Sequence, residues 1–198
     1  MHKMRYFFIG LALFFLAQSC EKEKKQSGLP TDGDGNTYDT IVLGTQVWLT
    51  ENLKTTKYND GYPIPLAEED ESWTSTGRAA YCWYQNDQYY KNTFGAIYNW
   101  YAAWMDDYLC PVGYHVPTIE EWETLIEYFN NSSSDVEESF KAINAGWRDW
   151  AGSFVYSSYG SWWAYSLQEA CISSAFSIGY MPENTGFSIR CVKTNNKR

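Results

Sequence analysis

The sequence predicts an α+β domain with two helices, short antiparallel strands and long loops. Three observations lead to this fold class. Two segments repeat apolar residues at helical spacing, several short runs have the composition and alternation of strands, and the connecting segments are rich in glycine, serine and aromatic residues. Large rings suit such a loop-rich domain, because they bury much area with few rotatable bonds.

The first residues form an export signal. A short basic region precedes an apolar run over residues 6–16, which is too short to cross a ~30 Å hydrocarbon core but suits a signal peptide. Small residues then lead to Cys20, as in a bacterial lipobox. We predict a lipoprotein signal peptide over residues 1–19, with lipidated Cys20 beginning a flexible linker over residues 20–31. The alternative is an ordinary signal peptide followed by an incidental cysteine.

The domain is expected to begin with a β-hairpin. Residues 37–43 and 45–49 are two strand-like runs around Gly44, and residues 79–84 form a further strand that carries Cys82. The buried members expected in the hairpin are Val42, Val47 and Trp48.

Two helices are predicted, over residues 94–105 and 119–129. The second has the stronger pattern, because Thr118 and Glu121 have the spacing of a capping box. Its apolar face is expected to consist of Ile119, Trp122, Leu125, Ile126 and Phe129. The alternating residues 187–192 predict one final strand.

The number of cysteines agrees with the predicted export and lipidation. The chain has five cysteines, and lipidation of Cys20 leaves Cys82, Cys110, Cys171 and Cys191. Four cysteines in an oxidising compartment can form two disulfides, with three possible pairings. Their spacing does not suggest a metal site.

Composition narrows the possible partners. The formal net charge is −9, which disfavours nucleic acid and anionic lipid as partners. No later segment has a long apolar run, so the lipid anchor is the only membrane contact expected. Aromatic residues make up 19% of the chain, a proportion that suits glycan or peptide recognition as well as a ring-filled core.

The sequence contains no clear motif for a catalytic site or a metal site. His115 is the only histidine after the signal peptide, and its place before a helix indicates a structural role. No pair of carboxylates stands out as a glycosidase pair. The segment Asp32–Asn36 looks like the start of a calcium loop, but an EF-hand would need a glutamate where Leu43 stands. We expect no catalytic residues and no metal ligands.

The best candidates for ligand contact are rings in the glycine- and serine-rich loops after residue 146. These loops can present flat ring faces, although each ring could instead belong to the core. The predicted ligand-binding residues are Trp150, Tyr156, Tyr159 and Trp162.

Seven motifs in order carry a family resemblance. They are Asp34–Tyr38, Trp48–Leu53, Tyr58–Gly61, Tyr81–Tyr84, Phe94–Tyr101, Cys110–Thr118 and Gly186–Val192. Together they resemble the Fibrobacter succinogenes major paralogous domain, which is common in surface lipoproteins of Bacteroidetes and Fibrobacteres. The resemblance places this domain over residues 32–195.

The resemblance implies a C-type lectin-like fold, in which two helices pack on small twisted antiparallel sheets and the terminal strands pair. It also implies a Cys110–Cys191 disulfide, which would leave Cys82 to pair with Cys171. Ligand-binding C-type lectins hold calcium and sugar with tripeptides that this chain lacks, since Pro182-Glu183-Asn184 scrambles one of them. Calcium is therefore possible but unsupported, and we expect no cofactor.

Three functions follow from the sequence. The first is a non-catalytic, lipid-anchored binding or adhesion module for a glycan or protein, located in the outer membrane and able to face the exterior. The second is a structural component of an outer-membrane envelope assembly, which predicts a broad apolar patch. The third is an enzyme related to formylglycine-generating-type domains, which predicts a deep pocket with convergent titratable groups.

Overall fold

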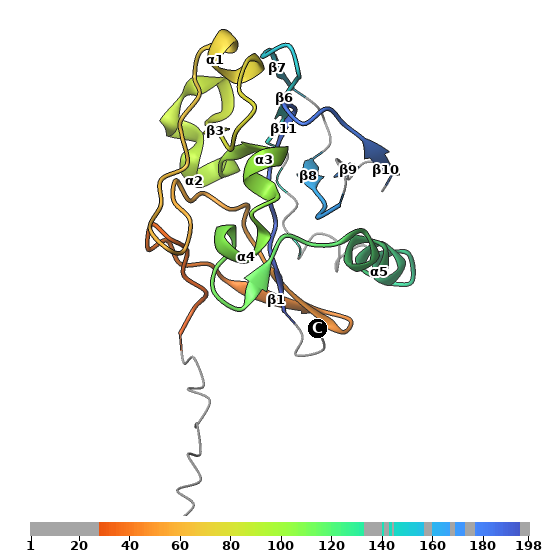
Figure 1. The fold of residues 1–198 in the computed structure, drawn as a ribbon. Helices are drawn as coiled ribbons and strands as arrows, with labels where there is room; N and C mark the ends of the chain where they lie inside the picture. Colours follow the sequence, from red (N-terminus) through yellow and green to blue (C-terminus); the bar gives the residue numbers. More distant parts are fainter. Residues whose placement is uncertain are drawn as a thin grey trace, which may run out of the picture.

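The computed structural model describes residues 28–132, 140, 143, 145–156, 160–166, 169–172 and 177–194. These residues form short helices and three antiparallel sheets, which confirms the α+β class (Figure 1). The predicted signal peptide, Cys20 and the linker up to residue 27 lie outside the described residues.

The first sheet joins the two ends of the domain. Its strands, in spatial order, are β1 (Thr40–Leu43), β2 (Gln46–Leu49), β12 (Val192–Lys193) and β5 (Tyr114–His115). The predicted hairpin is confirmed, with Val42 opposite Val47. Trp48 pairs with Val192, so the hairpin lies beside the last strand, as the resemblance implies.

One prediction about the hairpin core is wrong, because Val42 is 68% exposed. The register places Ile41 opposite Trp48, on the face where Leu43 and Trp48 pack in the same hydrophobic cluster as the helix residue Trp122. Val42 points to the other face of the pleat, near the free end of the hairpin, and remains in solvent. Val47 is half-buried and Trp48 is fully buried.

The other two sheets contain the remaining strands. The five-stranded sheet has the order β3 (Tyr81–Cys82), β4 (Ile97–Asn99), β11 (Gly186–Phe187), β6 (Trp147–Arg148) and β7 (Phe154–Val155). The three-stranded sheet has the order β10 (Ser177–Tyr180), β9 (Glu169–Ile172) and β8 (Ser161–Trp163).

Residues 186–193 connect all three sheets. β11 lies in the middle of the five-stranded sheet, and β12 lies between β2 and β5. Between these strands, Ser188 forms a parallel bridge with Trp162 of β8. The single strand predicted over residues 187–192 is therefore wrong in its extent, because the segment changes partners along its length. All of residues 186–192 are buried.

The second predicted helix is confirmed as α5 (Ile119–Asn130). The Thr118 hydroxyl accepts from the Glu121 N–H at 3.3 Å, and the Glu121 carboxylate accepts from the Thr118 N–H at 2.9 Å, which is the predicted capping box. Trp122, Leu125 and Phe129 are buried on its apolar face. In the described part of the chain, no helix is long and apolar enough to cross a membrane.

The first predicted helix is wrong. Residues 94–105 contain the end of α2 (Lys91–Phe94), then β4, and then the single turn of α3 (Trp100–Ala103). Gly95 interrupts the helix with a φ of +75°, and an added Cβ there would lie 2.7 Å from the Leu53 carbonyl oxygen. The other short helices are α1 (Asp70–Thr74), η1 (Tyr84–Asn86), η2 (Gln88–Tyr90) and α4 (Asp106–Leu109).

Aromatic rings fill the core. Beneath α5, the Trp122 ring lies 4.9 Å from Trp48 and 5.9 Å from Trp162, measured between ring centroids. The buried Arg190 donates to the Asn52 side-chain oxygen at 2.8 Å. The Trp162 indole donates to the same oxygen at 2.9 Å. Asn52 thus satisfies donors of two buried side chains, Arg190 and Trp162.

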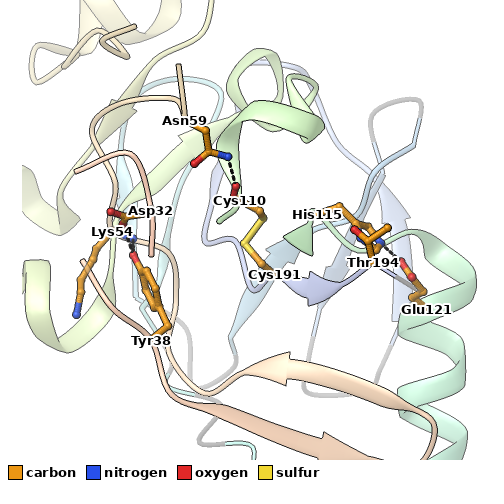
Figure 2. Close-up of a disulfide and its surroundings, with 9 residues drawn as sticks. All are labelled: Asp32, Tyr38, Lys54, Asn59, Cys110, His115, Glu121, Cys191 and Thr194. Atoms are coloured by element: carbon orange, nitrogen blue, oxygen red, sulfur yellow. Dashed lines mark hydrogen bonds and ion pairs between the residues drawn. A yellow bond between two sulfur atoms is a disulfide. The ribbon is translucent and has the colours of Figure 1, made fainter. Parts of the chain in front are cut away.

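The structure contains the predicted Cys110–Cys191 disulfide (Figure 2). It links the segment before β5 to the segment before β12, and both cysteines are fully buried. Cys82 is a free, buried cysteine, so the predicted Cys82–Cys171 disulfide is wrong in this structure. The Cys171 side chain lies outside the described residues. Burial raises the pKa of the Cys82 thiol to about 12, so this thiol is a poor nucleophile.

Buried tyrosines should make the fold sensitive to alkali. Burial raises the pKa of Tyr38 and Tyr98, and it raises that of Tyr58 to about 12. The folded chain keeps these protons at a pH where unfolded tyrosines, with a pKa of about 10, have lost theirs. The free energy of unfolding, measured in urea, should therefore be unaffected by these groups below about pH 9 and should fall as the pH rises from 10 towards 12.

A matched variant tests this pH dependence. The Tyr58 hydroxyl is buried and has no hydrogen-bond partner among the described residues. Tyr58→Phe should therefore retain wild-type stability at neutral pH and lose less stability than the wild type above about pH 10. An equal loss in both proteins would show that Tyr58 does not contribute to the alkaline transition.

Candidate functional site

An open hollow of about 500 Å³ lies where the end of α1 and the start of α3 meet the segment after β10. Its lining residues are Thr74, Ser75, Thr76, Gly77, Tyr101, Tyr180, Pro182, Glu183 and Asn184. We call it the Tyr101–Tyr180 hollow. Hydroxyls, a carboxylate, an amide and two phenol rings share one concave surface, and a concave site with a few polar groups is typical of small-ligand binding.

A tight turn fixes the polar side of the hollow. The Thr185 N–H donates to the Pro182 carbonyl at 2.8 Å, and the Trp100 N–H donates to the Glu183 carbonyl at 3.0 Å. The Tyr101 hydroxyl donates to the Glu183 carboxylate, and this hydrogen bond raises the pKa of Tyr101. The carboxylate is therefore held in one position by a hydroxyl that keeps its proton.

Asn184 connects the hollow to its neighbours. Its carbonyl accepts from the Trp73 indole of α1 at 2.6 Å, and its side-chain amide donates to the Trp150 carbonyl at 3.0 Å. Trp150 lies in the turn between β6 and β7, and its side chain is 61% exposed. The turn that carries Trp150 is thus hydrogen-bonded to one edge of the hollow through the Trp150 backbone carbonyl.

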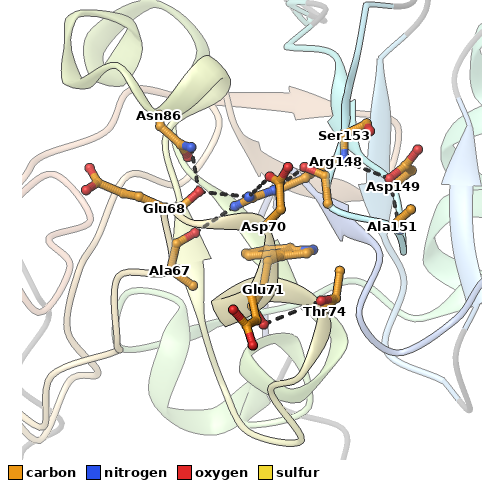
Figure 3. Close-up of polar contacts among 12 residues, drawn as sticks. Ala67, Glu68, Asp70, Glu71, Thr74, Asn86, Arg148, Asp149, Ala151 and Ser153 are labelled. Carbon is orange, nitrogen blue, oxygen red and sulfur yellow. Dashed lines mark hydrogen bonds and ion pairs between the residues drawn. The ribbon is translucent and has the colours of Figure 1, made fainter.

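Arg148 connects the segments around α1 (Figure 3). Its fully buried guanidinium donates to the Asp70 carboxylate at 2.8 Å and lies 4.8 Å from the centre of the Trp73 ring. At 2.6–2.8 Å it also donates to the carbonyls of Ala67, Glu68 and Gly152. One side chain therefore joins the segment before α1 to the β6–β7 turn.

The β6–β7 turn has a defined shape. The Asp149 carboxylate accepts from the Ala151 and Ser153 N–H groups at 2.9 and 2.8 Å. Gly152 has a φ of +95°, and an added Cβ there would lie 2.9 Å from the Asp70 Cβ. This close approach requires glycine and keeps the turn that carries Trp150 against α1.

An acidic pocket of about 590 Å³ lies beside the hollow and shares Ser75 with it. The residues that line it are Glu68, Glu69, Asp70, Glu71, Ser72, Ser75 and Asn86. Its four carboxylates give this end of the domain a negative potential.

The four predicted ligand-binding rings have different environments. Trp150 and Tyr156 are exposed, with 61% and 75% of their surface accessible. Trp162 is 1% exposed and is packed beneath α5, so its prediction as a ligand contact is wrong. The local sequence could not reveal this, because Asn52, which binds the Trp162 indole, is distant in the chain. Tyr159 lies outside the described residues.

His115 is buried inside the domain (Figure 2). Its Nε2 lies 2.7 Å from the Glu121 carboxylate, and its Nδ1 lies 3.0 Å from the Thr194 hydroxyl. The imidazole links β5 to the start of α5, which agrees with the predicted structural role. Among the described residues, no group of three or more histidines, cysteines, aspartates or glutamates could hold a metal ion.

The family model described as the Fibrobacter succinogenes major domain matches residues 41–193, which is most of the chain. The chain belongs to this family. The resemblance inferred from the seven motifs is therefore confirmed. The matched residues run from β1 to β12 and include the whole Tyr101–Tyr180 hollow. No curated protein and no solved structure matches the chain.

The sequence did not reveal most of the hollow of this Fibrobacter succinogenes major domain. Tyr101 lies in the segment predicted as one helix, and Glu183 and Asn184 belong to the tripeptide that departs from the lectin pattern. These residues meet through the pairing of β11 with β4, which places Gly186 opposite Asn99. One sequence signal could have indicated this loop. Pro182 favours a turn close to the aromatic residue Tyr180, and surface loops commonly carry binding residues.

Proposed function

We propose that this chain is a non-catalytic, lipid-anchored binding module of the outer membrane, facing the exterior. Its ligand is a glycan or a protein. The Tyr101–Tyr180 hollow and the exposed ring of Trp150 form its binding surface. The acidic net charge argues against nucleic acid as a ligand.

The position of the hollow carries this proposal. α1, whose end lines the hollow, and the β6–β7 hairpin, which Asn184 contacts, lie at one end of the domain, whereas the described chain starts at the other end (Figure 1). A lipid on Cys20 would tether the domain from that start. The hollow would then point away from the membrane, where a ligand outside the cell can reach it.

The C-type lectin-like architecture is part of the same proposal. We infer that the fold is a variant of the C-type lectin-like architecture. Two features support this inference: β2 pairs with β12, and a disulfide joins the segments that precede β5 and β12. The end of α1 lines the hollow, and α1 lies at the opposite end of the domain from β1 of the terminal sheet (Figure 1).

Cells that express the full chain can test the proposal. We expect the wild type to fractionate with the outer membrane and to make cells adhere to some surfaces in a panel of immobilised glycans and proteins. Cys20→Ala should release the protein from the membrane, because the lipid is its only anchor. Trp150→Ala/Tyr180→Ala should remain anchored but lose adhesion.

Tyr62→Ala/Tyr89→Ala provides the matched control, since both tyrosines are exposed and neither lines the hollow. This variant should adhere like the wild type. Wild-type cells that adhere no better than cells without the protein would contradict the binding function. Membrane retention of Cys20→Ala equal to that of the wild type would contradict the lipid anchor.

A further inference from the structure

We propose that the Tyr101–Tyr180 hollow binds an uncharged oligosaccharide, with one sugar ring packed on Tyr180. This inference rests on the proposed function and narrows its ligand class. It draws on three properties of the hollow: its exposed rings, its fixed hydrogen-bonding groups and the charge around it.

The rings give a saccharide an apolar surface to pack on. Tyr180, at the end of β10, is 69% exposed and lines the hollow. Trp150 is 61% exposed, and its backbone carbonyl accepts a hydrogen bond from the lining residue Asn184. A sugar ring has an apolar face of C–H groups, and aromatic side chains bind such a face at low cost in conformational entropy because they have few rotatable bonds.

The polar groups suit the hydroxyls on a sugar. The Glu183 carboxylate accepts hydrogen bonds, and the side-chain amide of Asn184 stands next to it in the chain. The hydroxyls of Thr74, Ser75 and Thr76 donate to backbone carbonyls and remain able to accept hydrogen bonds from a sugar.

These groups are positioned before a ligand arrives. Glu183 is held through its backbone by Trp100 and through its carboxylate by Tyr101. Asn184 is held by the Trp73 indole. Because the groups are already ordered, little further ordering opposes binding.

The surrounding charge selects among saccharides. Glu183 lies in the hollow, and the acidic pocket over residues 68–71 adjoins it at Ser75. Arg148, which donates to Asp70 and to backbone carbonyls, is fully buried, whereas Arg78, which follows the lining residue Gly77 in the chain, is exposed. The carboxylates of Glu183 and of residues 68–71 outnumber these two arginines, so a uronic acid would be repelled, whereas an uncharged sugar would not.

Calorimetry on the full chain in detergent tests the ligand class. The probes are soluble oligosaccharides of glucose, mannose and xylose, together with oligogalacturonate as the charged counterpart. We expect at least one uncharged probe to bind and oligogalacturonate not to bind. Tyr180→Ala should weaken binding of the uncharged probe about tenfold, and Tyr180→Phe should restore most of it because the ring remains.

The matched control is Tyr62→Ala, because Tyr62 is also 69% exposed but does not line the hollow. It should bind like the wild type. A second variant tests the role of charge. Glu69→Gln/Glu71→Gln leaves the Arg148–Asp70 ion pair intact and should allow oligogalacturonate to bind, with little change for the uncharged probe.

Two results would overturn the inference. One is a wild type that binds none of the uncharged probes, and the other is a Tyr180→Ala variant that binds them unchanged. Neither result alone removes the proposed function. If adhesion to a protein-coated surface persists and depends on Trp150 and Tyr180, the binding module stands and its ligand is a protein.

Discussion

Removal of the Cys110–Cys191 disulfide is expected to lower the free energy of unfolding by about 4 kcal/mol. The bond joins residues separated by 81 positions, so it restricts a large loop in the unfolded chain. It also fixes the segment before β5 to the segment before β12 inside the central core. Urea unfolding of Cys110→Ala/Cys191→Ala, compared with the wild type at neutral pH, measures this loss.

Reductant and Cys82→Ala complete this test. The free Cys82 thiol forms no crosslink, so Cys82→Ala should lose only about 1 kcal/mol and should remain sensitive to reductant. Reductant should leave the Cys110→Ala/Cys191→Ala variant unchanged. A further loss of stability in reductant would reveal a second disulfide and would restore the pairing of Cys82 with Cys171 that the structure contradicts.

Arg148→Met is expected to cost about 3–5 kcal/mol. The buried guanidinium supplies donors to the carbonyls of Ala67, Glu68 and Gly152, and methionine would leave them without these donors. The substitution should also weaken binding at the Tyr101–Tyr180 hollow, because Arg148 joins the segment before α1 to the turn that carries Trp150. Urea unfolding gives the stability change.

Asp70→Asn distinguishes the contribution of the Arg148–Asp70 ion pair from that of the hydrogen bonds between Arg148 and the backbone carbonyls. The Asp70 side chain is 70% exposed, so solvent screens its interaction with Arg148. We expect Asp70→Asn to cost less than about 1 kcal/mol. If Arg148→Met cost no more than Asp70→Asn, the three carbonyls would have found other donors, and the supporting role of Arg148 would be rejected.

Local sequence determined some elements of the fold. The helix α5 was predictable because its capping box, Thr118 and Glu121, and its apolar spacing all lie within one short segment. The hairpin β1–β2 was predictable for the same reason. Long-range pairing determined the rest. Tyr98 and its neighbours have helical spacing, but Tyr98 pairs with Tyr81 on one side and Phe187 on the other, and those partners make the segment a strand.

In the candidate site, too, the features set by local sequence were predictable and those set by long-range contacts were not. Exposure of Trp150 could be anticipated, because it lies in a turn with small and polar neighbours. Burial of Trp162 could not, since it depends on the packing of α5 and on Asn52. The meeting of Tyr101 with Glu183 depends on the pairing of β4 with β11, two strands far apart in the chain.

The arrangement of residues 186–193 has a consequence for biosynthesis. β11 and β12 occupy interior positions in two of the three sheets, so the five-stranded sheet cannot be completed before residue 187 has been made, and the four-stranded sheet cannot be completed before residue 193. A nascent chain that lacks these strands has unpaired neighbours on both sides and stays open. This delay would suit the export that the sequence predicts, in which an extended chain crosses a membrane and folds on the far side.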